Sequence, residues 1–143
     1  MRRRAKRRAR AARSSRACQS RPDRTMGRWY TRAIVPVADV QRSVDFYARL
    51  GFDEDWRHAE GDELLVAQVS RQGCELLLSC QWPKRNGQAL TFISLDDDEI
   101  DGVREQFERA GIAVRDGHWG YRVMIVDDPD GNQLLFPYSQ ARS

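Results

Sequence analysis

The chain of 143 residues has few of the side chains that most often carry chemistry, with three cysteines and two histidines. Cys74 and Cys80 lie six positions apart in one expected strand, too far for a disulfide, and no Cys-x-x-Cys spacing occurs. Neither His58 nor His118 has a second His or Cys at ligand spacing, so nothing indicates zinc. Reduced thiols are typical of a cytoplasmic protein, which is the location we expect.

Long apolar runs are also missing, which excludes a membrane-spanning helix and an ordinary secretory signal. The fingerprints of serine hydrolases, P-loop proteins and dinucleotide-binding proteins are absent as well. The length fits one domain with a core of modest size. The sequence therefore predicts a single small domain in which no residue is assigned a catalytic role.

The net charge of +3 is an average of two unlike parts. Residues 1–25 hold 11 of the 24 basic residues but one acid, which gives +10, whereas residues 26–143 carry −7. Because residues 1–25 contain no Val, Ile, Leu, Phe, Trp or Tyr, we expect a disordered basic head outside the domain of residues 26–143. An organellar transit peptide or an arm for nucleic acid or an anionic surface is an alternative. We favour upstream sequence translated ahead of a start at Met26.

Periodicity predicts two similar halves in residues 26–143. Each half has a strand, an amphipathic helix that ends at a glycine, and three more strands. The first half has its helix between Asp39 and Gly51, and the second between the run Asp96–Asp98 and Gly111. Expected strands cover residues 30–37, 52–58, 63–70 and 74–81, then 89–95, 112–116, 121–126 and 132–137. The strings YARLGF and FERAGI end matching helices at an offset of 60, which supports an internal repeat.

The string DDPDGN at 127–132 is similar to a calcium-binding loop, but its residues do not match the ligand positions of such a loop. With Gly131 at the fixed glycine of an EF-hand, Val126 and Pro137 occupy positions that need oxygen ligands. The string instead predicts a hairpin turn, in which Asp130 bonds its own backbone and Gly131 tolerates a positive φ.

Two longer strings carry a resemblance to a known family. VPVADVQRSVDFYARLGF resembles the opening, and WGYRVMIVDDPDGNQLLF the closing segment, of the vicinal oxygen chelate superfamily, the glyoxalase, bleomycin resistance and extradiol dioxygenase group. The resemblance covers residues 30–138. It implies an α+β fold of two paired βαβββ modules, about 28–82 and 88–138, whose curved mixed sheets surround a cavity, commonly in a homodimer.

The metal ligands that the resemblance implies are replaced. Enzymes of the family would carry His, Glu or Gln at the positions that fall on Arg32, Leu77, Leu90 and Leu135. None of these side chains offers a lone pair suited to a divalent cation, so we expect no metal and no cofactor. This pattern resembles the bleomycin resistance branch, which sequesters a cationic glycopeptide in grooves at a dimer interface and performs no chemistry.

Strand alternation then predicts the side chains that face the cavity. They are Arg32, Ile34, Glu75, Leu77, Ser79, Leu90, Phe92, Gln133 and Leu135, and the predicted ligand-binding set adds Trp56, Trp82, His118, Trp119 and Tyr121. Arg32 and Glu75 are expected to lie close enough to pair.

The function that these features favour is metal-independent binding and sequestration of a small organic ligand of the bleomycin type. The partners we expect are that ligand and a second copy of the chain, without a membrane and without nucleic acid except at the basic head. The alternative is an enzyme, a lyase, isomerase or dioxygenase with a displaced metal site or an acid/base pair such as Glu75 with His118.

Overall fold

The computed structural model describes residues 27–96 and 98–138, and the chain divides into two units, residues 1–32 and 33–143. The predicted basic head of residues 1–25 and the proposed start at Met26 lie outside the described residues. In the first unit, residues 27–32 form no helix or strand. All the elements below belong to the second unit.

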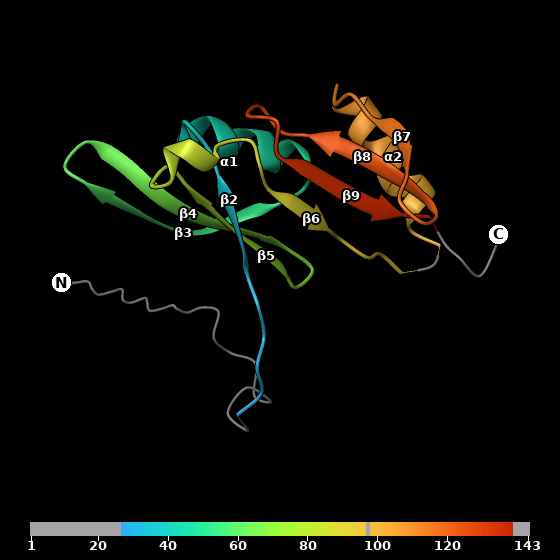
Figure 1. Ribbon diagram of the computed structural model, residues 1–143, viewed down its shortest axis with the longest axis horizontal. Helices are drawn as coiled ribbons and strands as arrows, with labels where there is room; N and C mark the ends of the chain where they lie inside the picture. Colours follow the sequence, from blue (N-terminus) through green and yellow to red (C-terminus); the bar gives the residue numbers. More distant parts are fainter. Residues whose placement is uncertain (1–26, 97, 139–143) are drawn as a thin grey trace. The chain divides into compact units, whose positions relative to one another are not determined.

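The first module is a four-stranded mixed sheet with one helix (Figure 1). Its elements in chain order are β2 (Ala33–Pro36), α1 (Val40–Arg49), β3 (Asp53–Glu60), β4 (Glu63–Arg71) and β5 (Cys74–Ser79). The strand order is β2-β5-β4-β3, with β2 parallel to β5 and the other pairs antiparallel. The module is thus a βαβββ unit.

The second module repeats this arrangement after a short 3-10 helix, η3 (Pro83–Arg85). It contains β6 (Leu90–Phe92), α2 (Ile100–Arg109), β7 (Arg115–His118), β8 (Arg122–Asp127) and β9 (Gln133–Pro137). The order β6-β9-β8-β7, with β6 parallel to β9, matches the first sheet strand for strand. The predicted α+β fold of two paired βαβββ modules is confirmed.

Both helices end in the same way, and this sets where the next strand begins. Gly51 and Gly111 have φ of 90° and 81°, and the amides of Phe52 and Ile112 donate back to the carbonyls of Tyr47 and Phe107 at 3.0 Å. This is the Schellman pattern of a helix C-terminus. β3 begins directly after Phe52, whereas β7 begins at Arg115, later than the expected strand 112–116.

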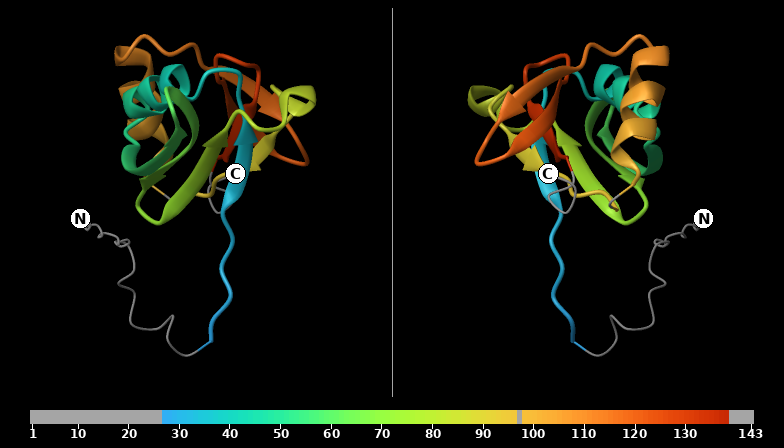
Figure 2. Two further views of the ribbon diagram at one scale, coloured as in Figure 1. Left: turned by 90° about the vertical axis from the view of Figure 1, so that its left-hand side faces the viewer. Right: turned by 90° about the vertical axis from the view of Figure 1, so that its right-hand side faces the viewer.

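The two helices lie side by side on one side of the sheets, as Figure 2 shows. Their apolar stripes, Val40, Val44 and Tyr47 on α1 and Ile100, Val103 and Phe107 on α2, are buried in the core. Among the described residues, no helix has the length and apolar character that crossing a membrane requires.

The turn at 127–132 holds the modules together by hydrogen bonds other than those expected. Asp128, not Asp130, bonds the local backbone, since its Oδ1 accepts from the amides of Asp130 and Asn132 at 2.9 Å. Asp130 reaches the first module instead, where its Oδ1 accepts from the Ala38 amide and the Arg42 guanidinium at 3.1 Å. The expectation that Asp130 bonds its own backbone is therefore wrong.

Candidate functional site

Three of the predicted ligand-binding residues lie in one row across the first sheet. Ile34 on β2 pairs with Leu77 on β5, Leu77 with Gln68 on β4, and Gln68 with Trp56 on β3. Paired residues point to the same face of a sheet. Since the alternate residues Leu76 and Leu78 are buried in the core, this row faces away from the helices.

The second sheet presents a comparable face. Phe92 on β6 pairs with Leu135 on β9, and Leu90 lies one pair before them, opposite Gln133. The hairpin between β7 and β8 folds Trp119 and Tyr121 onto Phe92, with ring centroids 5.3 and 6.2 Å from its ring. Because their alternate neighbours Leu134 and Phe136 are core residues, Phe92 and Leu135 also face away from the helices.

We call these two surfaces the helix-free faces. The first is the row Ile34–Leu77–Gln68–Trp56, and the second is the group Leu90, Phe92, Trp119, Tyr121 and Leu135. Both faces carry large apolar side chains that are open to solvent in the single chain, with Leu90 73% exposed, Trp119 63% and Ile34 47%, whereas Gln68 is buried. Large apolar side chains that gather on one exposed surface usually mark a place where a ligand or another chain binds.

The remaining predicted site residues are placed as follows. Glu75 and Ser79 lie on β5, two residues to either side of Leu77, and Ser79 is buried. Trp82 is exposed just before η3, and His118 is exposed at the end of β7. Arg32 belongs to the first unit, where its guanidinium lies 5.9 Å from the centre of the Tyr30 ring. Its pairing with Glu75 stays a prediction.

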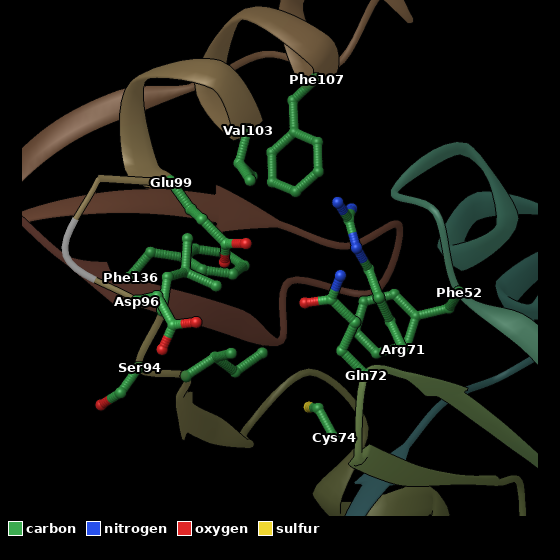
Figure 3. A pocket seen from close by; sticks show the side chains of 12 residues that line it. Phe52, Arg71, Gln72, Cys74, Ser94, Asp96, Glu99, Val103, Phe107 and Phe136 are labelled. Carbon is green, nitrogen blue, oxygen red and sulfur yellow. The ribbon is translucent and has the colours of Figure 1, made fainter.

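A cavity that the sequence did not predict lies on the helix side of the sheets (Figure 3). Its volume is about 170 Å³, and none of the predicted ligand-binding residues lines it. Its apolar lining consists of Phe52, Ile93, Leu95, Val103, Phe107 and Phe136. Its polar lining consists of Arg71, Gln72, Cys74, Ser94, Asp96 and Glu99.

Several charged side chains are paired at the outer edge of the second sheet. The Arg104 guanidinium donates to Asp116 at 2.8 Å and holds the pKa of that carboxyl below its usual range. The Arg115 guanidinium donates to both carboxylate oxygens of Asp127 at 3.1 Å and lowers the pKa of Asp127 in the same way. These pairs stabilise ionised surface carboxylates. By strand pairing, Arg115 and Asp127 lie on the same side of the second sheet as Leu90 and Leu135.

The fold and the two apolar faces define a class of small α+β proteins built from paired βαβββ modules. The chain belongs to the Glyoxalase/Bleomycin resistance protein/Dioxygenase superfamily, whose model matches residues 28–136. No curated protein matches it.

Three solved structures show the range of proteins that share the fold. An antibiotic-binding protein from Streptomyces sp. CB03234 is 24% identical, with a TM-score of 0.65 over 79% of this chain and 97% of that one. A bleomycin-binding protein in complex with bleomycin is 20% identical, with a TM-score of 0.62 over 79% and 100%. A lactoylglutathione lyase from Agrobacterium tumefaciens is 18% identical, with a TM-score of 0.61 over 77% and 92%.

The residues present do not fit the metal that dioxygenases and related enzymes of this fold use. Leu77, Leu90 and Leu135 stand at three of the expected ligand positions, and a hydrocarbon side chain offers no electron pair to a cation. In the part of the chain that the structure describes, no three His, Cys, Asp or Glu side chains converge on a point where an ion could sit. No reaction step is therefore derived through a metal.

Proposed function

We propose that this protein binds a small organic ligand of the bleomycin type on its helix-free faces and sequesters it without chemistry. The proposal rests on the exposed aromatic group of the second sheet, in which the rings of Trp119 and Tyr121 contact the ring of Phe92. Clustered aromatic rings on an open sheet offer a surface for the planar groups of a ligand, because they combine large contact area with little loss of rotamer freedom.

Composition and relatives support the same proposal. Residues 26–143 carry a net charge of −7, which suits a cationic ligand. Two of the similar structures are described as a bleomycin-binding and an antibiotic-binding protein, although identities of 20% and 24% show the fold alone. The proposal includes a homodimer, a cytoplasmic location and free thiols at Cys74 and Cys80.

The enzyme alternative has less support from the positions of its residues. Glu75 lies on β5 in the first sheet, whereas His118 lies on β7, the outermost strand of the second sheet. Because the two residues lie in different sheets, strand pairing does not bring them together as an acid/base pair. Metal analysis of the purified protein tests this alternative, since a near-stoichiometric transition metal would show that the ligand positions have been assigned wrongly.

The proposal is tested by titrating the protein with bleomycin and following tryptophan fluorescence. We expect a saturable change with one dissociation constant, and a dissociation constant about tenfold higher for Phe92→Ala, which removes the ring under Trp119. Trp29→Phe is the matched control, because Trp29 lies in the other unit and was not predicted to bind. A signal that does not saturate by about 100 µM drug would sink the assignment to this ligand class.

A further inference from the structure

The cavity on the helix side is built from segments far apart in the sequence. Arg71 ends β4, Gln72 lies in the turn and Cys74 begins β5. Asp96 and Glu99 come from the segment that leads into α2. Phe136 lines it from β9 and packs edge-on against Phe107 of α2, with ring centroids 5.7 Å apart. Since Leu135 points to the opposite face, the sheet itself separates this cavity from the helix-free faces.

The size of the cavity limits what it can hold. A volume of about 170 Å³ is close to that of apolar protein cavities which accept a single benzene ring. Three phenylalanines, Phe52, Phe107 and Phe136, line the space and offer edges and faces to an aromatic or cyclic aliphatic body. The occupant is therefore a compact molecule of roughly one ring with a short polar substituent.

The polar side chains face one another across the cavity. Figure 3 shows the Glu99 carboxylate directed inward from one wall, and the Gln72 amide and Arg71 guanidinium directed inward from the other. Gln72 has a φ of 50°, a left-handed conformation that costs a non-glycine residue free energy. The two-residue turn between β4 and β5 requires this conformation and places the amide at the cavity.

The balance of charge favours a cation. The Arg71 guanidinium is already engaged, since Nη1 donates to the Leu50 carbonyl at 2.6 Å and Nη2 to Gln106 Oε1 at 3.2 Å. Among the described residues, no cation pairs with Asp96 or Glu99 within salt-bridge distance. Both carboxylates lie on the segment that precedes α2. The oxygens that Arg71 bonds are neutral, so its positive charge remains. Two carboxylates against one guanidinium leave one excess negative charge beside an aromatic space.

We propose that this cavity is a second ligand site, distinct from the helix-free faces, for a compact organic cation with an aromatic or cyclic body. The ring occupies the space between Phe52, Phe107 and Phe136, and the ammonium group meets the carboxylates of Asp96 and Glu99. This site does not rest on the proposed binding of bleomycin, since none of its residues belongs to the helix-free faces.

The alkylation rate of Cys74 measures whether the cavity is occupied, because Cys74 lines the cavity. Cys80 does not line it and serves as the internal control. Burial raises the pKa of the Cys74 thiol, so alkylation by iodoacetamide is followed at about pH 8.5, where the thiolate fraction is larger. Peptide mass spectrometry measures both rates in the full chain. Benzylamine is titrated to about 10 mM, because so small a ligand binds weakly. We expect it to slow the alkylation of Cys74 severalfold and to leave the alkylation rate of Cys80 unchanged.

Ligand charge and two variants complete the test. Benzyl alcohol should protect Cys74 about three- to fivefold less well than benzylamine, and benzoate less well still. The double variant Asp96→Asn with Glu99→Gln should lose the preference for benzylamine. Asp101→Asn, an exposed position in the first turn of α2 outside the cavity, should retain it.

The proposal is overturned if benzylamine leaves the Cys74 rate unchanged, if benzoate protects equally, or if the double variant keeps the preference. The ligand series on the unaltered protein decides the matter even where the double variant does not fold. Bleomycin titration of the double variant should match that of the parent chain, so failure of one site is distinguishable from failure of the other.

Discussion

Asn132 shows how much of this fold depends on one side chain. It is 1% exposed, and its Oδ1 accepts from the Ala89 amide at 2.9 Å. Its Nδ2 donates to the Pro36 carbonyl and to Asp128 Oδ2, both at 2.9 Å. The amide therefore joins the end of β2 in the first module to the start of β6 and the β8–β9 turn in the second.

We predict that Asn132→Ala lowers the free energy of unfolding by about 2–3 kcal/mol, because it leaves the Ala89 amide without its partner and removes one donor each from the Pro36 carbonyl and Asp128. Urea denaturation followed by circular dichroism measures the change. Gln41→Ala, which removes an exposed amide bonded to Asp45, should cost less than about 0.5 kcal/mol. Equal losses for the two variants would show that Asn132 does not join the modules in this way.

At this scale the sequence predicted the turn but not its hydrogen bonds. The residue types at 127–132 indicate a hairpin turn, because Pro129 and Gly131 have strong local preferences. The role of Asp128 depends on Tyr47, whose hydroxyl donates to its Oδ2 at 3.0 Å from 81 positions away. Burial together with this carboxylate raises the pKa of Tyr47. No local pattern indicates such a contact, and the turn sequence alone therefore does not distinguish Asp128 from Asp130.

The helices are the elements that the sequence predicted best, and they differ in their first turns. Asp39 caps α1, and its Oδ1 accepts from the Arg42 amide at 3.0 Å. Glu99 precedes α2 with φ −93° and ψ −21°, already near helical values, and its side chain makes no capping hydrogen bond. The internal repeat thus preserves the C-terminal ends of the helices more closely than the beginnings.

We therefore predict that Asp39→Ala lowers the free energy of unfolding by about 1 kcal/mol, the usual value of an N-cap hydrogen bond. Glu99→Ala should change it by less than about 0.5 kcal/mol, because no capping bond is lost. Chemical denaturation of both variants beside the parent chain makes the comparison. A cost for Glu99→Ala equal to that of Asp39→Ala would contradict the difference between the two helix starts.

At the scale of the whole molecule, the pairing registers put Ile34 with Leu77 and Phe92 with Leu135, each pair on one face of its sheet. That these faces line a ligand site stays a prediction. The sequence did not predict the helix-side cavity. Its lining extends from Phe52 to Phe136 and is assembled by the packing of both modules. No periodicity marks such residues, and an acidic run before a helix is more often a solvated helix start than part of a site.

The extent of exposed apolar surface leads to a prediction about assembly. Leu90 projects from β6 with 73% of its surface exposed, beside Phe92 on the same face. In a single chain a charge at this position costs little, since the side chain is already in contact with water. If a second copy covers the helix-free faces, the same charge would be buried in the dimer, where it is strongly unfavourable.

We predict that the unaltered chain sediments as a dimer at about 10 µM, whereas Leu90→Glu sediments as a monomer with an unchanged far-ultraviolet circular dichroism spectrum. Ala48→Glu, which adds the same charge at an exposed position on α1, should remain dimeric because that side of the molecule is not the interface. Sedimentation equilibrium at several concentrations makes the measurement. A monomeric parent chain, or a dimeric Leu90→Glu, would show that these faces are not the contact between two copies.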